Sequence, residues 1–241
     1  MLYLMGLGLG DEKDLTLREI EIARTCECFA ELYTNKWEGS LSELEKIIGK
    51  KINLLKRNEI ETKVFEIVSL AEKKDVAIFF PGDPLAATTH TEFLIEARRK
   101  KIPVRVLHNS SIFSAVAECG LQLYKFGKTA TIPFSGKLEN VKNVLKENKK
   151  IGAHTLLLLD LDSEMGIYMN TADAIKILLK EKVLKLADKI IAAGNLGTEN
   201  FEIVFASAKV LKDKKILTPA VLVIPGKLHF RERDFLENIK V

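Results

Sequence analysis

Cysteine is scarce in this chain of 241 residues, which has three in all: Cys26, Cys28 and Cys119. An odd number without a repeating spacing argues against a disulfide framework and favours a reducing compartment. Cys26 and Cys28 resemble half of a zinc site, but zinc takes about four ligands. No second pair of cysteines follows, and the histidines are scattered along the chain. We therefore expect no metal site.

Long apolar runs and a leader segment are also missing. No apolar stretch approaches the ~18 residues that a membrane span needs. The first residues, Met1 to Met5, have no basic segment before them and no small-residue cleavage site after them. This pattern is typical of a first strand and not of a signal peptide. No low-complexity linker or internal repeat interrupts the chain, and we expect a cytoplasmic protein.

A large charge of one sign is absent as well. The net charge is +4 and the sequence pI is about 8.8. The basic residues are interleaved with acidic ones; the run 98–101 follows Glu96, and Lys149-Lys150 follows Glu147. Such clusters are typical of solvated helix ends, where cations also suit the helix dipole. Nucleic-acid binding stays an alternative, but we do not expect it.

Short apolar runs alternate with helical periodicity in residues 1–109. We predict strands at 2–7, 30–34, 52–55, 76–80 and 104–107. Capping patterns predict helices that begin at Thr16, Ser40 and Thr89, and a further helix is predicted over 59–74. Strands that are apolar on both faces and alternate with helices predict a parallel sheet covered on both sides. Residues 1–109 are thus predicted to form an N-terminal α/β domain.

Strands crowd together in residues 110–241. Strands are predicted at 121–126, 129–132, 155–161, 189–193, 202–206 and 220–224, and helices at 138–149 and 172–187. The segment 111–119 is apolar almost all round, which predicts a buried connecting helix. Closely spaced strands with fewer helices predict a mixed sheet in a second, C-terminal α/β domain. The predicted fold class is therefore two α/β domains, with a parallel and a mixed sheet.

Glycines follow the first predicted strand in the run 6–10, Gly-Leu-Gly-Leu-Gly. Ligands of open α/β sheets lie beyond the carboxyl ends of the strands. A dinucleotide fingerprint would be Gly-x-Gly-x-x-Gly with a helix directly after it. Here Asp11 occupies the third required position, and the helix is delayed. A pyrophosphate cradle is not supported, and both a tight turn and a binding loop remain open.

A stiff acidic turn, Pro-Gly-Asp-Pro at residues 81–84, follows the fourth predicted strand. Two prolines and a glycine around Asp83 would hold its carboxylate in a fixed direction. The run of small residues at 86–89 then opens the next predicted helix and leaves room for a ligand. A simple turn would not need that run, so we favour a ligand site here.

Polar residues also follow the fifth predicted strand, in His-Asn-Ser-Ser at 108–111. The hydroxyls would cap the next helix, contact a ligand, or do both. Late in the chain, His229 is expected to be partly exposed and His154 to be structural. No Ser-His-Asp, Cys-His or phosphate-loop pattern stands out. The residues thus suggest a cleft between two domains and a reaction in which a cofactor carries the reactive group.

Six segments of the chain, in their order, resemble the tetrapyrrole-methylase superfamily, also called the class III methyltransferases. They begin at Gly6, Pro81, Ser111, Tyr124, His154 and Val223, and the similarity spans nearly the whole chain. The Gly-Asp-Pro turn is shared across the superfamily. The Thr-Thr-His at 88–90 and the Tyr-Lys-Phe-Gly-Lys at 124–128 single out the branch that acts in diphthamide biosynthesis.

This resemblance implies a homodimer of two α/β domains that binds S-adenosyl-L-methionine and forms S-adenosyl-L-homocysteine. The implied reaction is methylation of the amino group of a 3-amino-3-carboxypropyl histidine in translation elongation factor 2, repeated until diphthine is formed. No membrane or nucleic-acid partner is implied, and no catalytic base is assigned. The cofactor contacts that it implies are Leu9, Asp83, Ala86, Ser111, Ile112, Leu159, Ala193 and His229.

Three other interpretations remain. A sister methylase would act on a corrinoid or porphyrin ring or on ribosomal RNA, and the Thr-Thr-His at 88–90 counts against it. A non-catalytic module would use the same cleft for a nucleotide and would fail to bind S-adenosyl-L-methionine. A nucleic-acid-binding protein would reveal itself by an affinity that falls steeply with salt.

Overall fold

The structure, a computed structural model, describes residues 1–163 and 165–239, with the backbone alone at residues 58 and 60–63. The chain divides into two compact units, Met1–Phe113 and Ser114–Val241. The domain boundary predicted after residue 109 lies four residues before this division. In the described residues, no helix has both the length and the apolarity to cross a membrane.

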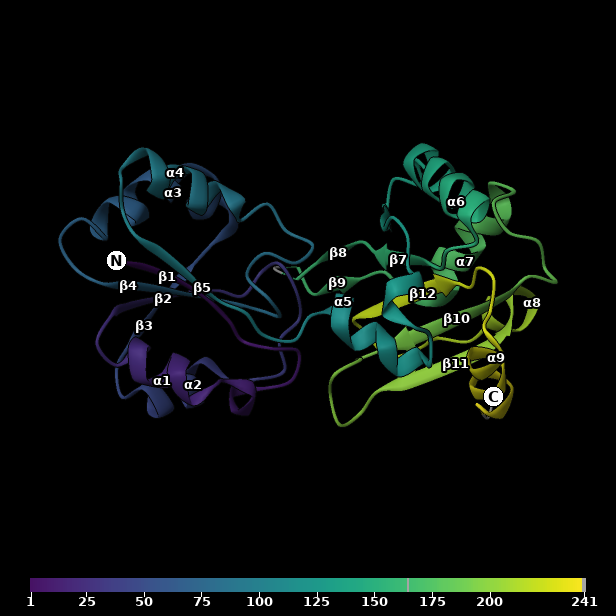
Figure 1. Ribbon diagram of the computed structural model, residues 1–241, viewed down its shortest axis with the longest axis horizontal. Coiled ribbons are helices and arrows are strands. Elements are labelled where there is room, and N and C mark those ends of the chain that lie inside the picture. The colour runs from purple at the N-terminus through teal and green to yellow at the C-terminus, as the bar shows by residue number, and fades with distance from the viewer. Residues whose placement is uncertain (164, 240–241) are drawn as a thin grey trace. The chain divides into compact units, whose positions relative to one another are not determined.

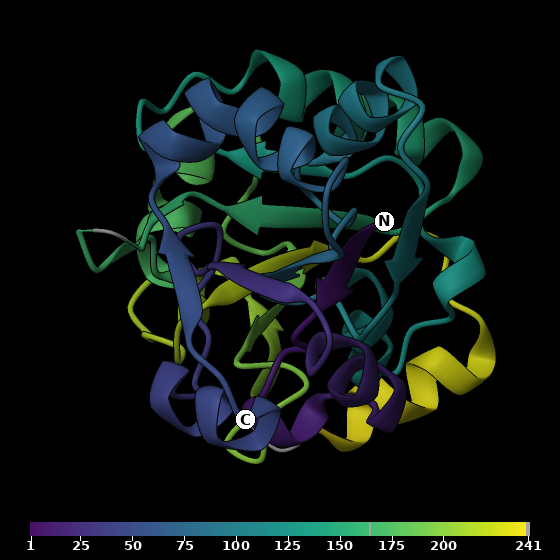
Figure 2. The ribbon, with the colours of Figure 1, turned by 90° about the vertical axis from the view of Figure 1, so that its left-hand side faces the viewer.

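The N-terminal unit is built on a parallel sheet of five strands in the order β3-β2-β4-β1-β5, which confirms the predicted architecture. Its strands are β1 (Leu2–Gly6), β2 (Glu27–Glu31), β3 (Ile52–Leu55), β4 (Val76–Phe80) and β5 (Val104–Leu107). The helices α1 (Leu17–Ala23) and α2 (Leu41–Ile48) cover one face, and α3 (Arg57–Leu70) and α4 (Thr91–Arg99) cover the other (Figure 1). Figure 2, with this unit toward the viewer, shows the two helical layers on either side of the strands.

Two cores flank this sheet because successive side chains of a strand point to opposite faces. In β1, Leu2 and Leu4 join the core that contains Phe93 and Ala97 of α4. Tyr3 and Met5 of the same strand, with Leu7 after it, join the core beneath α1 and α2. Burial on both faces is why the inner strands β1 and β4 are continuous apolar runs in the sequence.

The predicted helix starts had mixed outcomes. Thr16 caps α1 as predicted: its hydroxyl accepts from the Glu19 amide, and the Glu19 carboxylate accepts from the Thr16 amide at 2.8 Å. The capping box at Thr89 is wrong, because α4 begins only after His90 and has no side-chain cap. Residues 86–89 therefore form an irregular loop before the helix and not its first turn.

The second strand ends earlier than predicted. It runs over Glu27–Glu31 instead of 30–34. The buried Glu31 carboxylate accepts from the backbone amides of Tyr33 and Thr34 at 2.6 and 2.7 Å. These bonds curl the chain into a turn directly after the strand, which the apolar pattern alone does not reveal.

The C-terminal unit contains the mixed sheet that was predicted, in the order β11-β10-β12-β7-β6. Its strands are β6 (Ala130–Ile132), β7 (Thr155–Leu159), β10 (Lys189–Gly194), β11 (Glu202–Ser207) and β12 (Ala220–Ile224). Strands β6 and β7 are parallel, whereas β12 is antiparallel to both β7 and β10. A small hairpin pairs β8 (Leu161–Asp162) with β9 (Ile167–Tyr168).

Helices of this unit are α6 (Glu139–Ile151), α7 (Thr171–Lys180), α8 (Ala208–Leu211) and α9 (Phe230–Asn238). Apolar residues of α6 and α7 share one core cluster with β6, β7, β10 and β12. Helix α7 ends at Lys180, seven residues before the predicted end at 187, because the chain turns at Lys182, which has a φ of 56°.

Around residues 111–126 one prediction is wrong and one is confirmed in part. The predicted strand 121–126 is a 3-10 helix over Leu123–Lys125, in which Tyr124 is 81% exposed. The helix predicted at 111–119 is confirmed over Ile112–Cys119, as a short α5 (Ile112–Ala115) and a 3-10 helix (Val116–Cys119), but its all-round burial is wrong, because Phe113 is exposed. Gly120, with a φ of 74°, ends that helix, and local bonds then curl the next residues: the Lys125 amide donates to the Gln122 carbonyl at 2.9 Å and the Phe126 amide to the Leu123 carbonyl at 3.1 Å.

Candidate functional site

Three loops converge at the carboxyl edge of the parallel sheet, because β1 lies between β4 and β5. Gly8 donates its amide to the Gly82 carbonyl at 3.1 Å, and Gly82 donates to the Gly8 carbonyl at 2.8 Å. A Cβ on Gly6 would lie 2.5 Å from the Gly82 carbonyl oxygen. The glycines after β1 therefore allow one loop to lie against the next, which supports the tight-turn interpretation of this run.

Asn109 connects the three loops. Its side-chain amide donates to the carbonyls of Gly6 and Asp14, each at 3.0 Å, and its backbone amide lies 3.3 Å from Oδ2 of Asp83. The side-chain oxygen accepts from the Ser110 amide at 2.8 Å. No role was predicted for Asn109. The sequence signal that could have indicated its role was its position just after the fifth predicted strand.

The Asp83 carboxylate is fixed by three N–H groups. Oδ1 accepts from the Leu85 amide at 2.9 Å, while Oδ2 lies 2.7 Å from Nδ1 of His108 and accepts from the Asn109 amide. The side chain is 11% exposed. The turn thus holds an acidic group in one direction at the edge of the sheet, as its proline and glycine residues indicated.

The loop after Asp83 keeps the small residues open to a ligand. Ala86 is half-buried, and Ala87 has a φ of 55°, a left-handed conformation that is uncommon for alanine. Strained backbone of this kind clusters at ligand sites. Ser111 is buried directly before α5, and Leu9 and Ile112 are half-buried. The structure therefore brings five of the predicted contacts to one edge: Leu9, Asp83, Ala86, Ser111 and Ile112.

A buried pair, Glu31 and His90, anchors this loop from below. Nδ1 of His90 lies 3.0 Å from the Pro84 carbonyl, which only accepts, so Nδ1 carries a proton. Nε2 lies 3.5 Å from Oε2 of Glu31, and neither side chain is more than 4% exposed. Burial lowers the pKa of His90 to about 4 and raises that of Glu31. The loops after β2 and β4 are thus tied together through these two side chains.

Two predicted contacts in the C-terminal unit lie at one edge of the mixed sheet. Leu159 is the last residue of β7, and Ala193 lies next to the end of β10. Both strands pair antiparallel with β12, so they run in the same direction. Two strand spacings separate them, roughly 10 Å. Leu159 is 7% exposed and Ala193 is fully buried, so both belong to the packed end of this sheet.

His229 lies at the opposite edge of that sheet. It follows β12, the last residue of which, Ile224, pairs with Thr155 at the start of β7. The Gly226 amide in the connecting turn donates to Nδ1 of His154 at 2.8 Å. Within this unit the structure therefore does not bring His229 to Leu159. His229 is exposed and His154 is fully buried, in agreement with both predictions for these histidines.

Glu232 holds this second edge together, and sequence reasoning missed it. The buried carboxylate accepts from the amides of His229 and Gln122 at 2.6 and 3.0 Å, and it contacts Nε2 of His154 and the ammonium group of Lys125. Burial by itself raises the pKa of Glu232, but these donors outweigh it and hold the pKa at about 2. The available signal was a capping box, because Glu232 lies three residues after the N-cap His229.

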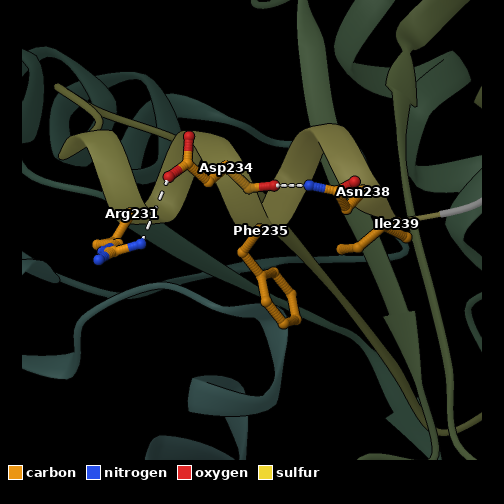
Figure 3. Close-up of a pocket in the computed structure, with 5 residues that line it drawn as sticks. All are labelled: Arg231, Asp234, Phe235, Asn238 and Ile239. Atoms are coloured by element: carbon orange, nitrogen blue, oxygen red, sulfur yellow. Dashed lines mark hydrogen bonds and ion pairs between the residues drawn. The ribbon is translucent and has the colours of Figure 1, made fainter.

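The described residues hold no metal cluster, and the hollow beside α9 is not lined by predicted contacts. A hollow beside α9 is lined by Arg231, Asp234, Phe235, Asn238 and Ile239, none of them a predicted contact (Figure 3). Among the residues that the structure describes, no group of three or more His, Cys, Asp or Glu side chains is placed to hold a metal ion. The carboxyl edge of the parallel sheet and the two edges of the mixed sheet are therefore the candidate functional regions.

Comparison with known proteins assigns the chain to a family. The family of tetrapyrrole (corrin/porphyrin) methylases matches residues 1–211. The chain belongs to the tetrapyrrole methylase family. Diphthine synthase from Methanocaldococcus jannaschii is 39% identical over 99% of this chain and 98% of its own length. Diphthine synthase from Methanothermobacter thermautotrophicus is 39% identical, with coverage of 99% and 95%.

Solved structures of this family have the same fold. A crystal structure of diphthine synthase matches with a TM-score of 0.90 at 34% identity, and the match covers 98% of this chain and 95% of that one. That of a putative diphthine synthase from Entamoeba histolytica matches with a TM-score of 0.90 at 32% identity, with coverage of 100% and 98%. The protein is therefore a methyltransferase with the tetrapyrrole-methylase fold, in the diphthine synthase group.

Proposed function

We propose that this methyltransferase performs the diphthine synthase reaction. It transfers methyl groups from S-adenosyl-L-methionine to the amino nitrogen of a 3-amino-3-carboxypropyl histidine in translation elongation factor 2, until the trimethylammonium product is formed. The observation that carries the proposal is similarity to diphthine synthases over 99% of the chain and 98% of the relative's own length. Elongation factor 2 acts in the cytoplasm, so we propose the same location for this enzyme.

The loops of the N-terminal unit fit the proposed cofactor. The Asp83 carboxylate can accept a hydrogen bond from a hydroxyl or ammonium group of the cofactor. Three N–H groups hold this carboxylate in place and leave one of its acceptor sites open. Ala86 and Ala87 leave the loop beside it free of bulk, and buried Ser111 adds a hydroxyl. We propose that these loops, with Leu9 and Ile112, hold part of S-adenosyl-L-methionine.

The C-terminal unit supplies the remaining proposed contacts, Leu159, Ala193 and His229. Leu159 and Ala193 are buried apolar residues at two strand ends, whereas the exposed His229 offers an imidazole. Bound S-adenosyl-L-methionine supplies a methyl group on a positively charged sulfur. The protein's contribution is to position the acceptor amine in line with that methyl group and to exclude water.

Calorimetric titration with S-adenosyl-L-homocysteine tests the cofactor part of the proposal. We expect micromolar binding at one site per chain. Incubation with elongation factor 2 that carries the unmethylated side chain should then add 14 mass units per transfer, up to three transfers. Absence of binding would contradict the proposal. Binding without transfer to this acceptor would favour the corrin or porphyrin acceptors of the wider family.

We also propose that the enzyme is a homodimer, as the family resemblance implies. Sedimentation at micromolar concentration should give twice the chain mass of 27.0 kDa. A monomer at that concentration would contradict this part of the proposal and leave the proposed reaction unaffected.

A further inference from the structure

The imidazole of His108 and the carboxylate of Asp83 form a dyad at the carboxyl edge of the parallel sheet. Nδ1 of His108 lies 2.7 Å from Oδ2 of Asp83. The His108 side chain is 67% exposed, whereas that of Asp83 is 11% exposed. The inner member of the dyad is therefore held by the protein, and the outer member faces the space in which ligands of such sheets bind.

The dyad defines the protonation pattern of the ring. An ionised carboxylate only accepts hydrogen bonds, so Nδ1 must be the donor. In the neutral imidazole the lone pair then lies on Nε2. Among the described residues, no hydrogen bond involves Nε2 of His108. Because the Leu85 and Asn109 amides fix Asp83, the carboxylate orients the ring and leaves Nε2 free to accept a proton.

The proposed reaction needs such an acceptor. An ammonium group has no lone pair and cannot attack a methyl carbon. Conversion of a primary ammonium to a trimethylammonium group releases three protons, one for each methyl group gained. Some group must take each proton when the acceptor is bound, and histidine is the side chain that most often does so near neutral pH.

We propose that His108 is the proton acceptor of this methyltransferase, with Asp83 as its positioning residue. Nε2 takes a proton from the acceptor ammonium, and the neutral amine then attacks the methyl carbon. The new N–C bond forms as the S–C bond breaks, and the electron pair of that bond stays on sulfur. The exposed ring passes its proton to solvent before the next transfer. This inference rests on the proposed amine acceptor.

Other charged groups near this turn are already engaged. The carbonyl of Asp14 accepts from the side chain of Asn109, and its carboxylate accepts from the Gly10 amide at 2.8 Å. Asp11 is the N-cap of a 3-10 helix over Glu12–Asp14 and pairs with Lys13 of that helix. Glu31 and His90 are buried below the loop. His108 is therefore the exposed titratable group that contacts Asp83 directly.

Substitution of His108 by Asn separates proton transfer from positioning. The Asn amide occupies nearly the place of Nδ1, so it can still donate to Asp83, but it cannot accept the substrate proton. We expect H108N to bind S-adenosyl-L-homocysteine within about threefold of wild type. At pH 7 its methyl transfer rate should fall by about 100-fold or more. The deficit should shrink as pH rises, because solvent then deprotonates the amine.

A second variant, H108A, tests the proposal if H108N loses affinity for the cofactor. Added imidazole should restore methyl transfer by H108A at saturating S-adenosyl-L-methionine, in proportion to the neutral imidazole present. An H108N rate within about twofold of wild type at pH 7 would overturn the inference, as would a deficit independent of pH or an H108A enzyme without imidazole rescue. If wild type binds no S-adenosyl-L-homocysteine, the proposed function itself fails.

Discussion

The two sheets of this protein differ in how they gather their functional residues. The parallel sheet of the N-terminal unit places the ends of β1, β4 and β5 at one edge, where five proposed contacts meet. The mixed sheet of the C-terminal unit reverses β12, so Leu159 and His229 lie at opposite edges. Strand direction alone thus decides whether residues that follow strands come together.

The carboxyl edge of the parallel sheet and the edge of the mixed sheet at His229 are also stabilised by different contacts. Asn109 and Asp83 tie the N-terminal loops by hydrogen bonds to neighbouring backbone, and the buried pair of Glu31 and His90 lies beneath them. In the C-terminal unit a single carboxylate, Glu232, joins three separate segments. Substitution of Glu232 alone should therefore destabilise the C-terminal unit more than any single substitution among these residues destabilises the N-terminal unit.

The largest expected effect is that of Glu232→Ala. Breaking a buried, hydrogen-bonded ion pair costs about 3–5 kcal/mol, and this change leaves Lys125 and His154 without their carboxylate. Urea unfolding followed by circular dichroism should show the loss. Glu237→Ala, on the exposed side of the same helix, is the control and should change the free energy of unfolding by less than about 0.5 kcal/mol. Equal effects of the two variants would show that Glu232 does not hold this edge.

Acid should weaken the two units in different pH ranges. Burial lowers the folded-state pKa of His90 to about 4, so its contribution to stability is complete above the unfolded value of 6.5 and is lost as pH falls toward 4. The loss amounts to about 3 kcal/mol. The Glu232 contribution, with a folded-state pKa of about 2, is lost only as pH falls from 4.5 through 2.

A comparison of wild type with His90→Asn isolates the first of these ranges. Asn keeps a donor for the Pro84 carbonyl and does not titrate. The raised pKa of Glu31 has the opposite effect on stability, because the protonated carboxyl group that the folded state favours becomes more populated as pH falls. The quantity to compare is therefore the difference in free energy of unfolding between the two proteins. Fluorescence of Trp37, the single tryptophan, follows the N-terminal unit. A constant difference between pH 6.5 and 4 would contradict the assigned His90 pKa.

Asp83→Ala should weaken binding of S-adenosyl-L-homocysteine by at least about tenfold while the protein stays folded. A hydrogen bond to a charged group contributes about 1.5–3 kcal/mol, and the loops also lose their shared acceptor. Calorimetry measures the affinity, and Asp213→Ala, an exposed carboxylate in the other unit, is the matched control. Unchanged affinity in Asp83→Ala would remove Asp83 from the cofactor site.

His229→Asn should have the smallest effect, a loss of cofactor affinity of about threefold. Asn preserves the N-cap of α9, so the change removes only the exposed imidazole. A neutral hydrogen bond contributes about 1 kcal/mol or less net at such a site. If His229→Asn bound S-adenosyl-L-homocysteine more weakly than Asp83→Ala does, the C-terminal unit would contribute more to cofactor affinity than the N-terminal unit.

Much of the fold and part of the candidate site follow from local patterns. The apolar runs at 76–80 and 220–224 coincide with strands, because burial on both faces leaves a continuous signal. The runs at 52–55 and 104–107 also coincide with strands, although these lie at the edges of the sheet and are partly exposed. The Thr16 capping box and the rigid turn at Asp83 were also found, since each is made by residues close in sequence. The strand prediction at 121–126 was wrong, because an apolar segment of this length can also form a short 3-10 helix.

The sequence by itself determined the alternation of elements, the parallel and mixed sheets and the family resemblance, because these depend on side-chain periodicity and on short motifs. Only the tertiary structure decided which residues meet. The contacts of Asn109 with Gly6 and of Glu232 with Gln122 join residues about a hundred positions apart. The dyad of Asp83 and His108 likewise depends on the order of strands in the sheet, which no local pattern encodes.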